Sequence, residues 1–303
     1  MSISGLPANR TAPSVASSEA EQSREVKQSS EVKQSSEAKQ SSEMKQSSEA
    51  KQSSEVQQSR AAPTRKSTGP LKIGLLMMGH VDPKSVHVAG DYPELFGSLL
   101  ERQGIELVHY DLDEGRFPDD LRACDGWLSS PSRLSAYDPV PWLSEAEDLL
   151  REIIATEAPF VGICFGHQLL AQALGGTVEK SPHGWAVGVH DFDVVAHRPW
   201  MGEGTQSIAL IGSHQDQVTR LPDGAELLFS ADYCPYGGFA IGERAWTIQV
   251  HPEFVPSLAD HLLAGRIELI GAQRVAEARA TLARPLDRHV VAGWIGEFFA
   301  VNR

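Results

Sequence analysis

The stretch Gly162-Ile163-Cys164-Phe165-Gly166 closes the apolar run PFVGIC and is followed by HQLLAQALGG. The apolar run predicts a buried strand, and the apolar spacing after it is helical, with a glycine pair as a helix stop signal. Cys164 is therefore expected at a tight turn from a strand into a helix. Glycines on both sides of a residue at such a turn permit strand and helix to approach closely, as in a nucleophile elbow.

The chemistry expected of Cys164 follows from this position. The N–H groups at a helix N-terminus favour a negative charge, so they favour the thiolate over the thiol. Cys164 is thus a candidate nucleophile. The alternative is a buried apolar cysteine beside packing glycines, and this stretch alone does not decide between the two.

A second apolar strand, AWTIQV, runs directly into His251-Pro252-Glu253. A thiol needs a base to become a good nucleophile at neutral pH, and a carboxylate behind an imidazole fixes its tautomer and orientation. In an extended backbone residues i and i+2 point the same way, so His251 and Glu253 can meet as base and orienting group. As a lone motif, His-Pro-Glu could equally be a strand-end turn.

The remaining pattern from residue 71 onward is that of an α/β protein. The run LKIGLLMMG (71–79) predicts a buried parallel strand, and further strands and helices alternate after it up to PFVGIC. Such alternation predicts a parallel sheet whose reactive groups lie at the carboxyl ends of the strands. From Ala186 onward strands predominate, before helical stretches around 257–280 and 286–300. Residues 71–303 are expected to form one domain.

Residues 1–70 have a different composition. From Glu25 to Arg60 a hexapeptide of the type EVKQSS is repeated six times, with one apolar residue per repeat. Because six residues advance a helix by about 600°, the apolar positions form no continuous stripe. We interpret this region as a disordered low-complexity tail, with a transient helix or a partner-binding arm as the alternatives.

Charge and cysteine content limit the classes of function. Residues 71–303 hold 17 Lys and Arg against 32 Asp and Glu, and this acidic excess disfavours binding to nucleic acid or to an anionic membrane. Cys124, Cys164 and Cys234 are too few and too far apart for a disulfide framework, which indicates a cytoplasmic protein. No export signal and no run of about 18 apolar residues is present.

Taken as a pair, GICFGHQLLAQALGG and QVHPEF resemble the signature of class I glutamine amidotransferases. The similarity is greatest to stand-alone relatives of the GMP synthetase glutaminase domain, which include plant-type γ-glutamyl peptidases. Further matching pieces are GWAVG (184–188), SHQDQV (213–218) and the Cys-Pro step at 234–235. The resemblance implies a flavodoxin-like, mostly parallel sheet flanked by helices, and a cysteine that attacks a γ-glutamyl amide to form a thioester.

Carried over by position, the resemblance implies a catalytic triad of Cys164, His251 and Glu253. It also implies that Gln168 contacts the glutamyl head group and that the Phe165 N–H contributes to an oxyanion hole. The second N–H group comes from a glycine-rich turn in the family. Here that turn reads Ser129-Ser130-Pro131-Ser132, so Ser130 is the candidate in spite of this departure.

Three other residues have less specific expectations. His214 and Gln215 either line the glutamyl pocket or satisfy backbone groups, and His167 is expected to be structural. No acidic cluster has the spacing of a metal cage and no Walker or G-x-G-x-x-G loop follows a strand, so no cofactor is implied.

Three functions are compatible with these motifs. The first is a glutaminase that hydrolyses glutamine and passes ammonia to a separate synthetase, and the second is a self-sufficient γ-glutamyl peptidase or hydrolase. The third, from another class, is a binding scaffold that acts through its tail. The intact Cys/His/Glu set favours the first two.

The tail leads to a simple prediction. Removal of residues 1–66 should leave the melting temperature and any hydrolysis unchanged, because the repeats have no apolar face to bury. Thermal denaturation of full-length and shortened protein checks this. A large fall in melting temperature on truncation would contradict it.

Overall fold

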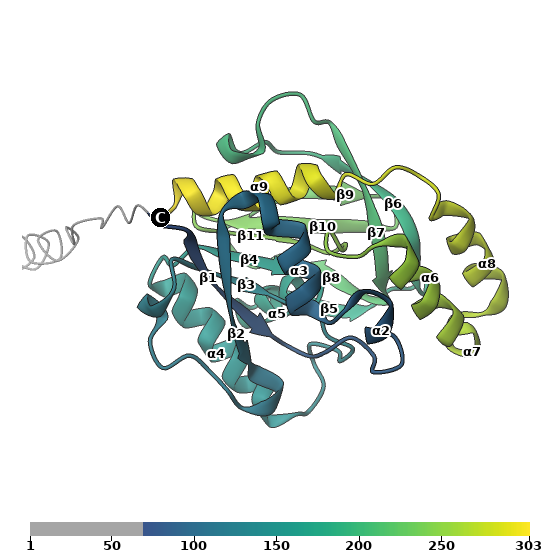
Figure 1. Ribbon diagram of the computed structural model, residues 1–303, viewed down its shortest axis with the longest axis horizontal. Coiled ribbons are helices and arrows are strands. Elements are labelled where there is room, and N and C mark those ends of the chain that lie inside the picture. Colours follow the sequence, from purple (N-terminus) through teal and green to yellow (C-terminus); the bar gives the residue numbers. More distant parts are fainter. Residues whose placement is uncertain (1–68) are drawn as a thin grey trace, which may run out of the picture. The chain divides into compact units, whose positions relative to one another are not determined.

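The computed structural model describes residues 69–303, so the predicted tail lies almost wholly outside the described part of the chain. Within residues 69–303 the central feature is one nine-stranded sheet, in the order β2-β1-β3-β4-β11-β10-β9-β6-β7, with helices on both faces (Figure 1). A second, two-stranded sheet pairs β5 with β8. The α/β fold expected from the sequence is confirmed.

Five parallel strands form one half of the large sheet. They are β1 (Leu71–Met77), β2 (Ile105–Asp111), β3 (Gly126–Ser129), β4 (Phe160–Ile163) and β11 (Ala245–Ile248). Taken along the chain, their order is 2-1-3-4-5, which is the flavodoxin-like arrangement. In such a sheet a ligand is expected at the carboxyl ends of the strands, and β4 and β11 lead directly to Cys164 and His251.

Four antiparallel strands extend the sheet on the other side of β11. They are β10 (Cys234–Ile241), β9 (Ala225–Ala231), β6 (Ala186–Val194) and β7 (Ser207–His214), and the separate pair is β5 (Thr177–Lys180) with β8 (Asp216–Arg220). The sheet is therefore mixed. The strands β5, β8 and β10 were not expected from the sequence, and β10 is interrupted by Pro235 and by Gly237-Gly238.

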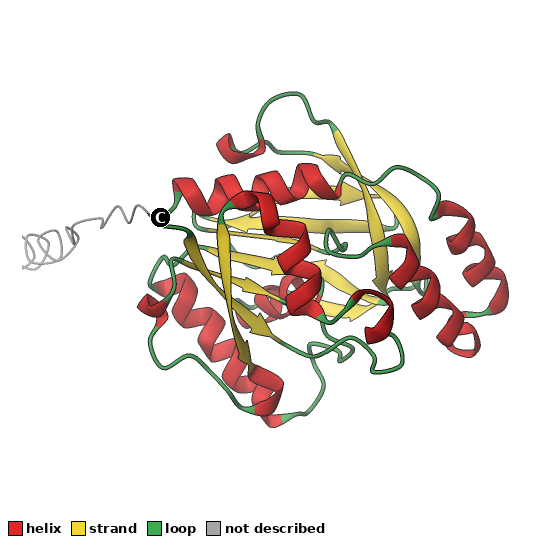
Figure 2. Ribbon diagram, viewed as in Figure 1, coloured by secondary structure: helices red, strands yellow, loops and turns green. Residues whose placement is uncertain are grey.

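Each face of the sheet has its own hydrophobic core. On β1, Ile73 and Leu75 pack with α3 (Tyr92–Leu100) and α9 (Arg288–Val301), whereas Leu76 packs on the opposite face. That opposite face of the sheet is covered by α4 (Pro141–Ala155) and α5 (Phe165–Ala173) (Figure 2). Alternate residues of a strand point to opposite faces, so a strand buried on both sides reads as the continuous apolar run seen in the sequence.

The remaining helices lie beside the antiparallel half. They are α6 (Pro256–Gly265), α7 (Ile267–Ile270) and α8 (Ala272–Thr281), and a short α2 (Val86–Ala89) contacts α6. The helical stretch expected around 257–280 is thus three helices. It breaks at Arg266 and at Gly271, which has φ 97°, a conformation that does not continue a helix. None of the helices in residues 69–303 has the length and apolar character needed to span a bilayer.

Candidate functional site

Cys164 lies between β4 and α5 in a backbone conformation that residues other than glycine rarely adopt. Its backbone has φ 50° and ψ −95°, while its N–H donates to the Ile248 carbonyl oxygen at 2.8 Å and its own carbonyl accepts from the Gln168 N–H at 3.1 Å. A strained residue of this kind persists only where its surroundings hold it. The expected strand-to-helix turn is therefore present, with its cysteine fixed at the end of β4.

The two glycines of the turn allow strand and helix to touch. A Cβ atom at Gly162 would lie 2.9 Å from the Gly166 backbone, and a Cβ at Gly166 would overlap the Ser129 hydroxyl of the neighbouring strand β3. Any larger residue at either position would push α5 away from the sheet. The glycine spacing is thus a packing requirement of the turn that presents Cys164.

His251 and Glu253 form a buried pair just after β11. The His251 Nδ1 atom lies 2.7 Å from Glu253 Oε1, and the two residues are 2% and 0% exposed. The His251 N–H donates to the Ile211 carbonyl at 2.9 Å, which joins this turn to β7, and the Phe254 ring stacks on the imidazole at 4.0 Å between centroids. The imidazole is therefore held by Glu253 and Phe254, and the backbone that carries it is held by β7.

Arg288, at the start of α9, supports the same turn. Its Nε donates to the Pro252 carbonyl at 2.8 Å and its Nη2 donates to the Glu253 carbonyl at 3.1 Å. This residue was not expected from the sequence, because it lies far along the chain from His251 and belongs to no local motif. Its role here is to fix the backbone that carries Glu253.

The charges around His251 favour its protonated form. Burial alone lowers the pKa of this histidine, but the adjacent Cys164 and Glu253 outweigh burial and raise it to about 10. The His251 Nε2 atom is buried and has no hydrogen-bond partner within residues 69–303. Gln249 Nε2 donates to the Cys164 sulfur at 3.5 Å. The arrangement can hold a thiolate beside an imidazolium.

A cavity of about 360 Å³ is lined by Cys164, His251, Gln168 and His214, and so joins four of the expected residues. Gln168 Nε2 donates to the Asp216 carbonyl at 2.7 Å and to Gln249 Oε1 at 3.1 Å, which fixes its side chain. His214 Nδ1 lies 3.1 Å from the Asp216 carbonyl, and burial lowers its pKa to about 3, so it is neutral near pH 7. Gln215 also lines the cavity.

The two expected N–H donors differ in their surroundings. Phe165 begins α5, where N–H groups have no partner within the helix, while its side chain is buried near Trp142. The Ser130 N–H, in contrast, donates to the Leu76 carbonyl at 2.9 Å and continues the pairing of β3 with β1. This corrects the expectation for Ser130, since an N–H used in the sheet is not free to face a substrate oxygen.

Several residues of the cavity wall were not expected from the sequence. Tyr92 is 5% exposed, and burial together with the charges of Glu253 and Cys164 raises its pKa well above the ordinary value. Arg133 and Arg266 also line the cavity and add positive charge to it. Tyr92 begins α3, Arg133 lies in the loop between β3 and α4, and Arg266 directly follows α6. No sequence motif marks any of them.

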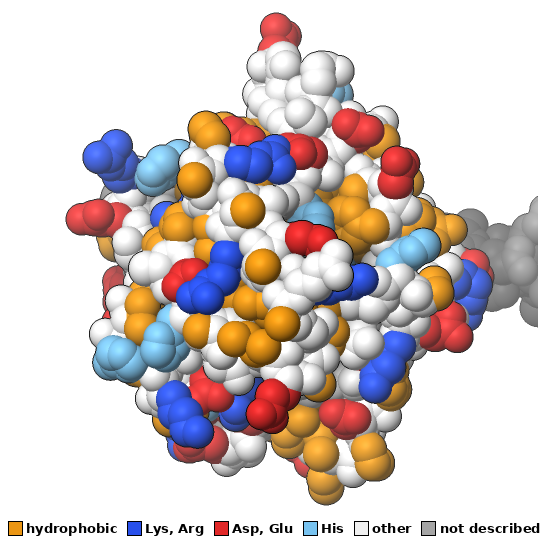
Figure 3. All heavy atoms as spheres, turned by 90° about the vertical axis from the view of Figure 1, so that its right-hand side faces the viewer, with side chains coloured by type: hydrophobic (Ala, Val, Ile, Leu, Met, Phe, Trp, Pro, Cys, Tyr) orange, Lys and Arg blue, Asp and Glu red, His pale blue; other side chains and the backbone are white. Residues whose placement is uncertain are grey.

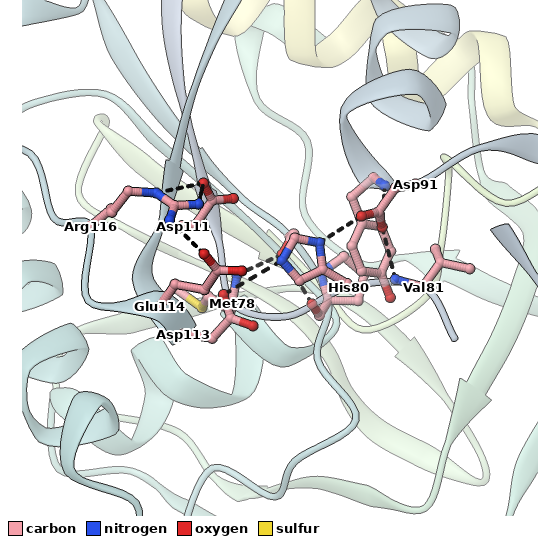
Figure 4. Close-up of polar contacts among 11 residues, drawn as sticks. Met78, His80, Val81, Asp91, Asp111, Asp113, Glu114 and Arg116 are labelled. Atoms are coloured by element: carbon pink, nitrogen blue, oxygen red, sulfur yellow. Dashed lines mark hydrogen bonds and ion pairs between the residues drawn. The ribbon is translucent and has the colours of Figure 1, made fainter. Parts of the chain in front are cut away.

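His80 lies on the same wall, between two carboxylates (Figure 4). Its Nδ1 is 2.6 Å from Asp91 Oδ2 and its Nε2 is 3.8 Å from Asp113 Oδ1. Burial lowers the pKa of His80, but the hydrogen bond and charge of Asp91 more than compensate and raise it. Asp91 also caps α3 by accepting from the Tyr92 N–H, and it accepts from the Val81 N–H, so this cluster fixes the loop that carries His80 to the start of α3.

The site contains no group suited to a metal cage. In residues 69–303 no three His, Cys, Asp or Glu side chains are placed to hold a metal ion. The sheet order and the cavity at the carboxyl ends of its strands define a flavodoxin-like α/β protein.

Comparison with known proteins gives the family. The family model "Glutamine amidotransferase class-I" matches residues 101–267. γ-Glutamyl peptidase 3 of Arabidopsis thaliana is 31% identical over 173 residues, which are 54% of this chain and 70% of that protein. A glutamine-hydrolysing GMP synthase of Porphyromonas gingivalis is 30% identical over 164 residues, 52% of this chain and 31% of that protein. The chain belongs to the class I glutamine amidotransferase family, which is a family of enzymes.

Solved structures agree on the fold. A glutamine amidotransferase from Thermotoga maritima has a TM-score of 0.62 with 19% sequence identity, and the match covers 77% of this chain and 97% of that one. A second, from Methylobacillus flagellatus, has a TM-score of 0.55 with 22% identity over 77% and 94% of the two chains. The flavodoxin-like fold expected from the resemblance is confirmed.

The close packing at Gly166 predicts a loss of stability on substitution. Gly166→Ala should lower the free energy of unfolding by about 1 to 3 kcal/mol, since its methyl group overlaps Ser129. The matched control is Gly293→Ala in α9, where nothing lies within 4 Å of the added atom and alanine is the better helix former by about 1 kcal/mol. Urea denaturation measures both. Equal effects of the two changes would contradict the packing requirement.

The charge environment of His251 predicts a pH dependence. A raised histidine pKa stabilises the fold at pH values below about 6.5, and this contribution is lost as the pH rises through about 10. Glu253→Gln should lower the His251 pKa, so that the loss occurs at lower pH. An NMR titration of the imidazole measures the shift, with the exposed Glu243→Gln as the control. An unchanged His251 pKa in the Glu253 variant would refute the role of this carboxylate.

Proposed function

We propose that this protein hydrolyses a γ-glutamyl amide through a thioester on Cys164. The observation that carries the proposal is the shared cavity of Cys164, at its strand-to-helix turn, and His251, which is bound to Glu253. The family and its relatives named γ-glutamyl peptidase and GMP synthase support this chemistry. We also propose that residues 71–303 act as one domain and that the protein is cytoplasmic, in keeping with three unpaired cysteines.

In the first half of the proposed reaction, His251 already holds the proton of the Cys164 thiol, and the sulfur attacks the γ-carbonyl carbon as a thiolate. The carbonyl oxygen becomes negatively charged, and we assign the Phe165 N–H as one of its donors. When the tetrahedral intermediate collapses, the C–N bond breaks and His251 gives its proton to the leaving amine. A γ-glutamyl thioester remains on Cys164.

In the second half a water molecule takes the place of the amine. His251 removes a proton from this water, the hydroxide adds to the thioester carbon, and the C–S bond breaks with return of a proton to sulfur. Glutamate leaves and the free cysteine is restored. Glu253 accepts the Nδ1–H hydrogen bond throughout, so it keeps Nε2 directed at the reacting atoms. Arg288 is a positioning residue because it acts through the Glu253 backbone.

Gln168 and His214 are proposed to contact the glutamyl head group. Both line the cavity, and each has one polar atom fixed by the Asp216 carbonyl oxygen. A neutral His214 presents Nε2, which is buried and lacks a partner in the described part of the chain. Such pre-positioned groups orient a small polar ligand without further ordering cost.

Two leaving groups are compatible with this chemistry. A glutaminase would release ammonia to a separate synthetase, and GMP synthase relatives favour such a partner. A self-sufficient γ-glutamyl peptidase would release an amino acid or peptide. Arg133 and Arg266 in the cavity wall favour the second candidate, because a leaving peptide carries a carboxylate that arginine binds well.

The central prediction concerns Cys164 itself. Cys164→Ala and His251→Ala should each reduce turnover by at least about 10³-fold, whereas Glu253→Ala should leave measurable activity because the imidazole is only disoriented. Turnover is assayed against glutamine and a panel of γ-glutamyl dipeptides. A glutamine-like chloroketone should label Cys164, as mapped by peptide mass spectrometry.

Cys124→Ala and Cys234→Ala are the controls for this experiment. Both side chains are free cysteines outside the cavity, and burial raises the pKa of each thiol, so neither is activated. Both variants should keep full turnover and labelling. Modification of Cys124 or Cys234 in place of Cys164, or full hydrolysis by Cys164→Ala, would overturn the proposed function.

A further inference from the structure

A second cavity, of about 340 Å³, lies between β6, the loop before it and α8. It is almost as large as the cavity at Cys164, and it falls within the range of about 300 to 1,000 Å³ in which proteins bind small ligands. The proposed hydrolysis makes no use of it. α8 belongs to a face of the molecule on which acidic, basic and apolar side chains are interspersed (Figure 3).

Aromatic rings form one wall of this second cavity. The His190 and Tyr233 rings lie 4.4 Å apart between centroids at an interplanar angle of 37°, and Trp185 lines the same space. The Tyr233 hydroxyl is buried and has no hydrogen-bond partner within residues 69–303. Val187 and Ala278 complete an apolar lining. A wall of this composition suits a planar apolar ring, since aromatic groups pack favourably edge-to-face or offset.

Opposite charges stand on α8 at the same cavity. Arg274 and Glu277 are three residues apart, so they project from the same side of the helix. Arg274 Nη1 donates to the His183 carbonyl at 2.8 Å and to the Trp185 carbonyl at 2.6 Å, which fixes the guanidinium beside the loop. Over residues 69–303 the Nε and Nη2 groups of Arg274 have no protein partner, and Arg274 forms no ion pair with Glu277, whose Oε1 accepts from Gln273 Nε2 at 2.9 Å.

We propose that the second cavity binds a free α-amino acid with an aromatic side chain. The carboxylate of this ligand pairs with Arg274 and its ammonium group pairs with Glu277. Its aromatic ring packs among Trp185, His190 and Tyr233. One cation and one anion on one face of a helix match a zwitterion better than an anion or a cation alone. This binding goes beyond the proposed hydrolysis and does not depend on it.

The second cavity is in physical contact with the first. Trp185 lines both, and the Tyr233 ring lies 6.4 Å from the ring of His214, which borders the cavity at Cys164. A bound amino acid therefore touches the wall that the two cavities share.

The test is a titration of the full chain with L-phenylalanine, followed by calorimetry and ligand-observed NMR. Two analogues of the same ring are titrated beside it: 3-phenylpropanoate, which lacks the ammonium group, and 2-phenylethylamine, which lacks the carboxylate. L-Phenylalanine should bind at least about tenfold more tightly than either analogue. Equal affinity for all three compounds would overturn the zwitterion match.

Neutral substitutions of the two charged residues on α8 test where the ligand binds. Arg274→Gln should weaken both L-phenylalanine and 3-phenylpropanoate by about tenfold, whereas Glu277→Gln should weaken L-phenylalanine but strengthen 3-phenylpropanoate. A misfolded variant cannot produce opposite effects on two ligands. The matched control is Arg279→Gln on the same helix, where Arg279 pairs with Asp260 away from the cavity and the substitution should change no affinity.

The result is independent of hydrolysis, because Cys164→Ala protein should bind L-phenylalanine as tightly as the unmodified chain. Binding by a protein that hydrolyses no γ-glutamyl compound would refute only the proposed function. Hydrolysis by a protein that shows no saturable binding of L-phenylalanine would refute only the second site. Binding that neither α8 substitution alters would also overturn this assignment.

Discussion

The parallel pairing of β4 with β11 is the interaction on which the site depends. Ile163 stands opposite Ile248 in this pair, and the Cys164 N–H donates to the Ile248 carbonyl. The two strands come from distant parts of the sequence, yet they end side by side, so the cysteine turn and the histidine turn lie at one edge of the sheet. A shift of the register by one residue would turn every side chain of β11 to the opposite face and separate the two groups.

The antiparallel half of the sheet supports the histidine half of the site. The Gln249 N–H donates to the Gly237 carbonyl in β10, and the His251 N–H donates to the Ile211 carbonyl in β7. The parallel strands therefore carry the two turns, while the antiparallel strands set the position of the chain beyond β11. The chain that carries the His251–Glu253 pair is thus bonded to both halves of the sheet.

The sequence predicted most of the core because its signals were local. The continuous apolar runs marked β1, β4 and β11, and the flanking glycines marked the turn at Cys164. The strand β10 lacked such a signal, since Pro235 and Gly237-Gly238 interrupt its apolar pattern. The helical stretch 257–280 looked continuous because the positive φ of Gly271 is a property of the folded chain.

The residues of the site likewise fall into two groups, those that a local motif marks and those that only tertiary packing brings in. Cys164, His251, Glu253, Gln168 and His214 lie within or beside short motifs, and the structure brings them to one region. Tyr92, Arg133, Arg266 and Arg288 reach it only through tertiary packing, which leaves no mark in their neighbouring sequence. Ser130 shows the opposite error. Its place in a motif suggested a free N–H, but the β1–β3 pairing already uses that group.

The hydrogen bonds from Arg288 to Pro252 and Glu253 have a consequence for synthesis on the ribosome. Arg288 follows Pro252 by 36 positions, and α9 also fills the core face that lies over β1. During synthesis the His251 turn is therefore translated before its arginine and before the helix that covers this core face. The nascent chain thus contains the His251–Glu253 turn before the contacts that fix its backbone can form, and the turn is fully fixed only when α9 docks.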